Sequence, residues 1–159
     1  MQLNELNALD EQAAIRALLR CCGSTQWARE MTAARPFAGT DAIAQTSDAI
    51  WSSLGRADWL EAFAAHPRIG DRSASSWAAA EQAGAARAAD EVRAQLAAKN
   101  RDYEARFGYI FIVCATGQTA DAMLAMLEQR LTNDPDEELH IAAEEQRRIT
   151  QLRLAKLLT

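Results

Sequence analysis

Helix breakers are scarce in this chain, and their scarcity constrains its fold more than any other feature. Glycine occurs 7 times and proline 3 times in 159 residues, while alanine is abundant. Alanine has the highest intrinsic helix propensity, and glycine and proline have the lowest. We therefore predict an all-α fold, a compact single-domain bundle of about seven to eight helices over residues 1–159, with a short extended segment near 107–115.

Capping residues and breakers mark where the helices should begin and end. Asp10, Ser24 and Thr119 can each cap a helix, and Asp134 followed by Pro135 opens the last one very plainly. The predicted helices cover residues 11–21, a segment after Ser24, a segment from 40 through Trp51, residues 59–65, about 77–106, a segment after Thr119, and 135 to about 158.

The stretch from Phe107 to Ala115 has the least helical character of the chain. It is rich in β-branched and aromatic residues and contains Gly108, with Gly117 shortly after it. We expect a short buried strand or extended segment there. Its N–H and C=O groups need hydrogen-bond partners, which either a ligand or neighbouring side chains and helix ends could supply.

Charge and composition exclude several classes of function. The formal net charge is −5 and no basic run occurs, which argues against binding to nucleic acid. No apolar run approaches the ~18 residues of a membrane span, and we see no signal peptide. Cys21, Cys22 and Cys114 have no metal-ligand spacing, and an odd count with an adjacent pair fits reduced thiols in the cytoplasm.

His66 is one of two histidines, and Pro67 follows it at once. Proline disfavours helix at the preceding residue and fixes its own φ at about −65°. The helix before His66 should therefore stop here and present the imidazole on a stiff turn. An unperturbed histidine has a pKa of about 6.5 and can exchange a proton at neutral pH. The alternative is that His66 merely caps a helix.

Two further polar residues should point inward. Glu81 falls on the same helix face as Ala85, Ala88 and Val92, and Arg153 lies between Ile149 and Leu157 on the apolar stripe of the last helix. An arginine on such a face must find an anion or extend to solvent. A core ion pair remains the alternative.

Together, an acid–base histidine, a carboxylate and a guanidinium would suit a small anionic substrate. The chain has no HExxH, no CxxC pair and no glycine-rich phosphate loop, so no motif supports metal or nucleotide chemistry.

The chain resembles the 2-oxo-4-hydroxy-4-carboxy-5-ureidoimidazoline (OHCU) decarboxylases, the enzymes of urate breakdown that make (S)-allantoin. The resemblance covers nearly the whole chain, and the order and spacing of its motifs carry it. The motifs are Arg35-Pro36-Phe37, His66-Pro67-Arg68-Ile69-Gly70, Glu81-Gln82-Ala83-Gly84, the run 106–115, Arg130-Leu131-Thr132-Asn133 and Leu152-Arg153-Leu154.

The resemblance implies an all-helical homodimer that acts on a small-molecule substrate and needs no cofactor or metal. It implies that His66 is the proton donor and that Glu81 also serves catalysis. The substrate-binding residues that it implies are Pro67, Gln82, Phe111, Ile112, Val113, Cys114, Ala115 and Arg153.

One position departs from the family pattern. The family usually has a serine three residues before the glutamate, and this chain has Ala78 there. One lost neutral hydrogen bond costs about 0.5–1.5 kcal/mol, which could weaken binding without abolishing chemistry. The competing hypotheses are a non-catalytic helical module that binds a small anion or a partner protein, and a structural domain whose polar residues pair internally.

Overall fold

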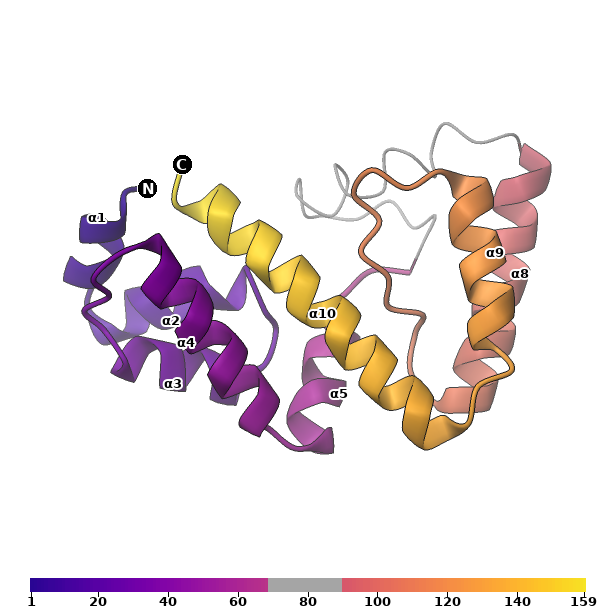
Figure 1. Cartoon of the computed structure of the whole chain (residues 1–159), viewed down its shortest axis with the longest axis horizontal. Helices are drawn as coiled ribbons and strands as arrows, with labels where there is room; N and C mark the ends of the chain where they lie inside the picture. The colour runs from indigo at the N-terminus through magenta and orange to yellow at the C-terminus, as the bar shows by residue number, and fades with distance from the viewer. Residues whose placement is uncertain (69–89) are drawn as a thin grey trace. The chain divides into compact units, whose positions relative to one another are not determined.

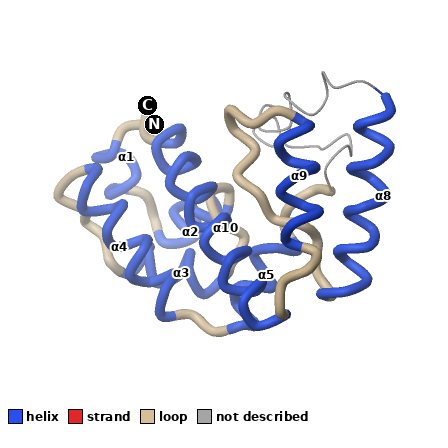
Figure 2. Tube along the Cα trace, turned by 45° about the vertical axis from the view of Figure 1, so that its right-hand side comes forward, coloured by secondary structure: helices blue, strands red, loops and turns tan. Residues whose placement is uncertain are grey.

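The regular secondary structure of the described part of the chain is all helix. The computed structural model describes residues 1–68 and 90–159, and these ranges contain eight α-helices and no strand (Figures 1 and 2). The helices are α1 (Leu3–Ala8), α2 (Glu11–Leu19), α3 (Thr25–Ala33), α4 (Thr40–Ser53), α5 (Arg56–Ala64), α8 (Asp90–Phe107), α9 (Ala120–Arg130) and α10 (Pro135–Leu157). The predicted all-α fold is confirmed.

The helices belong to two compact units. Unit 1 comprises Met1–Ala62 and Gln146–Thr159, and unit 2 comprises Phe63–Glu145. The first part of α10 belongs to unit 2 and its remainder to unit 1. That the chain folds as a single domain stays a prediction.

Short-range capping explains where several helices begin. The side chains of Asp10, Ser24 and Thr119 accept hydrogen bonds from the backbone N–H groups of Ala13, Trp27 and Ala122, at 2.8, 3.2 and 3.1 Å. Each bond satisfies one of the N–H groups that a helix start leaves unpaired. These three caps are where the sequence predicts them, although α2 ends at Leu19, two residues before the predicted end.

In unit 1, α2 packs against α3 and α3 against α4. Their apolar faces bury Leu18, Trp27, Met31 and Ile43. The short helix α1, which was not predicted from the sequence, also buries an apolar residue, Leu6.

The Arg35-Pro36-Phe37 motif fixes α1 in this unit. The Arg35 guanidinium donates to the carbonyls of Leu6 and Leu9 at 2.7 and 2.8 Å, near the end of α1. A cation is favourable there because the last carbonyls of a helix are unpaired and carry partial negative charge. Asn7 and Phe37 exchange two further hydrogen bonds of 2.9 Å each. This part of the family likeness therefore has a structural role.

In unit 2, α8 and α9 lie side by side (Figure 1). Tyr103 of α8 is fully buried among aromatic rings. Its ring centroid lies 4.6, 5.8 and 5.3 Å from those of Phe107, Tyr109 and Phe111. The predicted helix over 77–106 is confirmed from Asp90 onward, and its earlier part lies outside the described residues.

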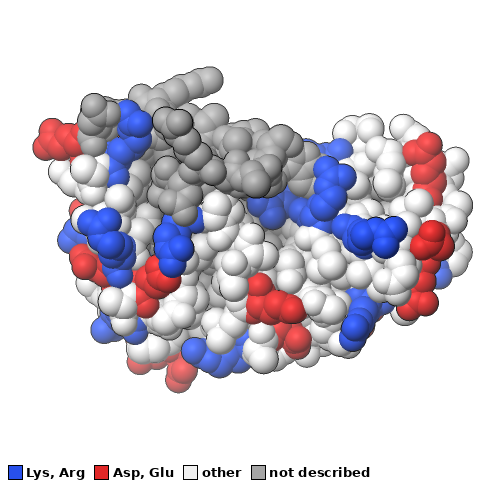
Figure 3. All heavy atoms as spheres, turned by 180° about the vertical axis from the view of Figure 1, so that it is seen from behind, with Lys and Arg blue, Asp and Glu red and all other residues white. Residues whose placement is uncertain are grey.

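The surface carries charges of both signs. Figure 3 shows acidic and basic side chains interspersed over the described part of one face. No helix within residues 1–68 and 90–159 combines the length and the apolar character that a membrane crossing requires.

Candidate active site

His66 lies where a helix has just ended. The helix α5 stops at Ala64, and the backbone N–H of His66 donates to the carbonyl of Phe63 at 3.1 Å. His66 and Pro67 are both half-buried. The predicted end of the helix before His66 is confirmed, although α5 begins at Arg56 rather than at Trp59.

Arg68 attaches the His66 turn to α8. Its Nε and Nη2 atoms donate to Oε2 and Oε1 of Glu104 at 3.0 and 2.7 Å. This two-point geometry matches a planar guanidinium to a planar carboxylate. The hydrogen bond from Arg68 lowers the pKa of Glu104 below its usual value. The pair is exposed, so its main effect is to fix the direction of the turn rather than to add stability.

The segment between α8 and α9 is irregular, as predicted, and begins one residue later than predicted because α8 includes Phe107. Phe111, Ile112 and Val113 are buried, and Cys114 and Ala115 are half-buried. Gly108 and Gly117 have φ values of +83° and +77°, in the left-handed region that favours glycine. Two glycine turns therefore flank a mostly buried, non-helical backbone.

Arg130 anchors this segment from within the core. It is 4% exposed, and its Nη1 atom donates to the carbonyl of Ile112 at 2.7 Å. The guanidinium carbon lies 4.5 Å from the centroid of the Phe111 ring, close enough for a cation–π interaction. One arginine thus contacts the backbone and a side chain of adjacent segment residues.

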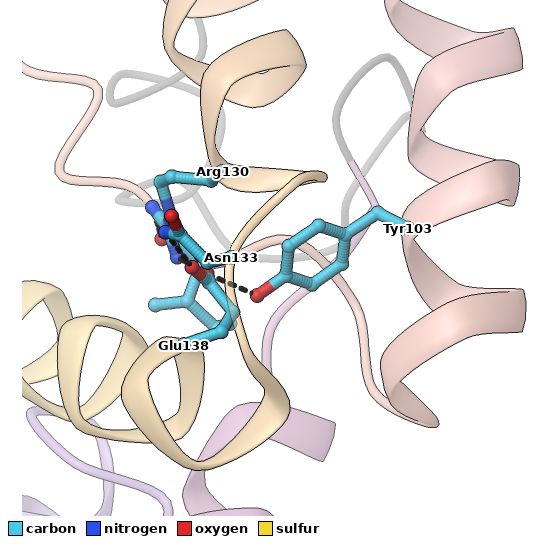
Figure 4. A network of polar contacts seen from close by, with 5 residues as sticks. Tyr103, Arg130, Asn133 and Glu138 are labelled. Carbon is cyan, nitrogen blue, oxygen red and sulfur yellow. Dashed lines mark hydrogen bonds and ion pairs between the residues drawn. The ribbon is translucent and has the colours of Figure 1, made fainter.

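Glu138 neutralises Arg130 and is itself fully paired (Figure 4). Its Oε1 lies 2.7 Å from Nε and 2.6 Å from Nη2 of Arg130. The Tyr103 hydroxyl donates to the same oxygen at 2.5 Å, and the Asn133 amide donates to Oε2 at 3.0 Å. Burial, followed by the hydrogen bond to Glu138, raises the pKa of Tyr103, so the hydroxyl keeps its proton and remains a donor.

The sequence analysis did not single out this network, although a signal for it exists. Arg130 continues the buried stripe of Met123 and Leu127 at helical spacing, and Glu138 lies four residues before the buried Ala142. Charged residues on apolar faces of two consecutive helices are candidates for a buried pair. Arg130 and Glu138 could therefore have been predicted in the same way as Arg153, from their positions on apolar helix faces.

Arg153 is half-buried on α10, in unit 1. The predicted inward stripe of this helix is confirmed, since Leu139, Ala142, Ala143, Ile149 and Leu157 are all buried.

The charge of Arg153 acts on Cys21 and Cys22. Burial raises the pKa of these thiols to about 12 and about 11, and the positive charge of Arg153 partly opposes the rise at both. Arg153 therefore lies near the buried thiols, which stay protonated at neutral pH.

The predicted site residues fall into three groups. His66, Pro67 and residues 111–115 lie in unit 2, and the Phe63 and Tyr109 rings, 5.2 Å apart, connect the two segments that carry them. Arg153 lies in unit 1, so its part in the same site stays a prediction. Glu81, Gln82 and Ala78 lie outside the described residues. Within the described ranges, no three acidic, histidine or cysteine side chains are grouped as a metal would require.

In unit 2, α8 thus contacts both the turn that carries the half-buried His66, through Glu104, and the buried main-chain segment, through Tyr103. A histidine in such a place can act as a general acid, and a fixed backbone can offer hydrogen bonds to a polar ring. This pairing suits proton transfer to a small bound molecule.

Comparison with known proteins extends these observations to the whole chain. The family model described as OHCU decarboxylase matches residues 7–155. The uric acid degradation bifunctional protein TTL of Arabidopsis thaliana is 41% identical over 149 residues. That match covers 86% of this chain, but the chain spans only 45% of that relative. The OHCU decarboxylase of Haloferax volcanii is 28% identical over 163 residues, covering 98% of this chain and 95% of the relative.

Solved structures agree. A crystal structure of OHCU decarboxylase in the presence of (S)-allantoin superposes with a TM-score of 0.80 and 40% identity, covering 88% of this chain and 95% of that one. An (S)-allantoin synthase structure, 20% identical, shares the fold with a TM-score of 0.74 over 99% of this chain and 54% of that one. Since the family model spans nearly all of the sequence and the fold agrees, this chain belongs to the OHCU decarboxylase family.

Proposed function

We propose that this chain is a carbon–carbon lyase that decarboxylates OHCU to (S)-allantoin, without a cofactor, in urate and purine catabolism. The observation that carries the proposal is the likeness to the OHCU decarboxylase structure, which extends over 95% of that chain at 40% identity. The half-buried His66, on a turn braced by Arg68 and Glu104, supports it.

The chemistry needs few catalytic groups. Loss of carbon dioxide breaks one carbon–carbon bond and leaves its electron pair on the ring carbon, where the adjacent imine can delocalise it. The carbon then takes one proton, on one face, to give (S)-allantoin. Because the substrate is its own electron sink, the protein has to orient the ring, stabilise developing charge and deliver that proton.

We assign His66 to assist departure of the carboxylate and to contribute to protonation of the ring carbon, with Pro67 shaping the turn that holds it. Main-chain groups of residues 111–115 orient the ring, and Arg153 anchors it through planar two-point hydrogen bonding. Glu81 holds the ureido or ring N–H groups, and Gln82 the polar edge. These assignments follow the family resemblance.

We also propose that the chain is a cytoplasmic homodimer that binds neither nucleic acid nor membrane. The dimer follows from the family resemblance. The three free cysteines, an odd count that includes the adjacent pair Cys21 and Cys22, support a reducing compartment.

The decisive experiment follows the optical activity of the product. Urate oxidase and hydroxyisourate hydrolase generate fresh substrate, the protein is added, and circular dichroism records allantoin formation. The spontaneous reaction gives racemic allantoin with little signal. We expect a rapid signal of the (S) enantiomer whose rate scales with protein concentration.

Well-folded protein that adds nothing to the spontaneous course would instead support a non-catalytic module for a small anion. Ala78, which replaces the serine usual in the family, is the observation that favours this second candidate. Ala78→Ser would then be the first variant to make, and recovery of an (S) signal would trace the missing activity to that position.

A further inference from the structure

Arg130 connects three segments of unit 2 that are separate in sequence. It lies at the end of α9, donates to the Ile112 carbonyl in the segment before α9, and pairs with Glu138 in the first turns of α10. Its guanidinium also lies against the Phe111 ring, 4.5 Å from the centroid. One buried cation therefore contacts both the backbone and an aromatic side chain of the proposed substrate-binding segment.

Stability alone does not account for such a pair. Burying two charges removes their hydration, and replacing a buried ion pair with apolar residues is often neutral or stabilising. A buried polar network does, however, fix geometry, because its hydrogen bonds are directional and breaking one is costly. Here both carboxylate oxygens of Glu138 accept hydrogen bonds. The hydrogen bond from Arg130 to the Ile112 carbonyl connects this network to the backbone of residues 111–115.

Tyr103 holds the same segment from α8. Its hydroxyl donates to Glu138 at 2.5 Å, and its ring meets the Phe111 ring edge-on with centroids 5.3 Å apart. The Arg130 guanidinium also lies 5.9 Å from the centroid of the Tyr103 ring, so these two groups and the Phe111 ring contact one another, and both Arg130 and Tyr103 bond to Glu138. Movement of one member would shift the others.

We propose that Arg130, held by Glu138 and Tyr103, is a positioning residue that sets the geometry of the substrate-binding main chain at residues 111–115. The inference rests on the proposed function, which gives this main chain its contact with substrate. Arg130 itself acts through the Ile112 carbonyl and the Phe111 ring. A binding surface of this kind must be held to within about 0.5 Å, and a misplacement of about 1 Å can cost roughly 10²-fold in rate.

The chain contains a matched control for Arg130. Arg106 also donates to a backbone carbonyl, that of Asn133 at 2.8 Å, and also lies over an aromatic ring, that of Phe107 at 5.0 Å. It lies in the same unit but is exposed, and it contacts neither Glu138 nor residues 111–115 directly, since it reaches the network only through the Asn133 carbonyl and the Phe107 ring. Substituting lysine at either position keeps the charge and removes the planar fork.

The experiment compares Arg130→Lys with Arg106→Lys by hydrogen–deuterium exchange and by steady-state kinetics. We expect Arg130→Lys to speed exchange of the backbone amides in residues 109–117 and to lower kcat/KM by about tenfold or more, chiefly through KM. Arg106→Lys should leave both within about twofold of wild type. If Arg130 only stabilised the fold, Arg130→Lys would reduce the fraction of active protein, and therefore the apparent kcat, without changing KM.

Tyr103→Phe keeps the test decisive if Arg130→Lys does not fold. It removes one hydroxyl and leaves the ring and the Arg130–Glu138 pair in place, so a smaller rise in KM, about twofold to tenfold, is expected. Normal exchange in residues 109–117, or an unchanged KM in folded variants, would overturn the positioning role.

Failure of the proposed function has a different signature. Wild-type protein that forms no (S)-allantoin contradicts decarboxylation, whatever the variants do. The exchange comparison needs no substrate, so it still decides whether Arg130 holds the segment.

Discussion

His66 is half-buried two residues after the end of α5, on a turn held by hydrogen bonds on both sides. Pro67 and the two-point contact between Arg68 and Glu104 limit the directions that the turn can take. A fixed turn of this kind suits the proton-donor role proposed for His66, because delivery of a proton to one face of a ring requires a fixed direction.

His66→Asn should lower kcat by about 10²- to 10⁴-fold, because asparagine can hydrogen-bond but cannot transfer a proton at neutral pH. The measurement is the initial rate of (S)-allantoin formation. The matched control is His140→Asn, which changes the only other histidine, an exposed one on α10, and should keep wild-type activity. A His66→Asn protein that retains more than about a tenth of wild-type activity would remove His66 from the chemistry.

Arg153→Lys should raise KM by about tenfold or more, because an ammonium group cannot reproduce planar two-point recognition of a substrate. Steady-state kinetics measure the effect. Arg148→Lys, at an exposed position on the same helix, is the control and should behave as wild type. An unchanged KM in Arg153→Lys would exclude Arg153 from substrate binding.

At the scale of the elements, the Arg68–Glu104 contact between the His66 turn and α8 should depend on pH. The pKa of Glu104 is lowered in the folded protein, so the carboxylate favours folding above its unfolded pKa of about 4.3. That contribution is lost as the pH falls below this value and through the lower folded pKa. The Arg68–Glu104 contact should therefore persist at neutral pH and open only in acid.

A carboxyl titration by NMR tests this contact. The Glu104 pKa should lie below the ordinary glutamate value in the wild type and return toward it in Arg68→Gln, because the largest cause of the shift is the hydrogen bond from Arg68. An ordinary Glu104 pKa in the wild type would contradict the contact in solution.

The elements also show which features the sequence makes predictable. The caps at Asp10, Ser24 and Thr119 act over three residues, so a local pattern predicts them. The helix α1 was missed because it is only six residues long and gains its place from Arg35, about thirty positions away.

The candidate site likewise has some features that the sequence predicts and others that it does not. Proline chemistry predicts the turn at His66, and residue composition predicts the irregular segment over residues 111–115. The network that holds this segment joins residues 8, 18 and 35 positions apart, from Arg130 to Glu138, from Arg130 to Ile112 and from Tyr103 to Glu138. Local periodicity can place Arg130 and Glu138 on apolar helix faces, but it cannot predict that these two residues pair with each other.

At the scale of the whole molecule, the likeness to OHCU decarboxylases identifies the family of this chain, which no local sequence pattern could do. The predicted set of inward histidine, glutamate and arginine side chains would suit a small anionic substrate, and many enzymes would fit that description. The family model over residues 7–155 assigns the chain to the OHCU decarboxylases, and the proposed reaction follows from that membership.

The proposed homodimer can be checked directly. Light scattering after size-exclusion chromatography should give a mass of twice the 17.4 kDa of one chain, unchanged over a tenfold dilution if the interface is as large as those of obligate dimers. A mass of one chain across that range would contradict the dimer while leaving the decarboxylation test unaffected.

The placement of aromatic residues gives the two units different optical signatures. Trp27, Trp51 and Trp59 all belong to unit 1, whereas both tyrosines, Tyr103 and Tyr109, belong to unit 2. The fourth tryptophan, Trp77, lies outside the described residues, so a Trp77→Phe protein would confine tryptophan fluorescence to unit 1. Far-UV circular dichroism, in contrast, reports on the helices of both units. Denaturation curves from the two signals would coincide if the chain melts as one cooperative domain and separate if the units melt independently.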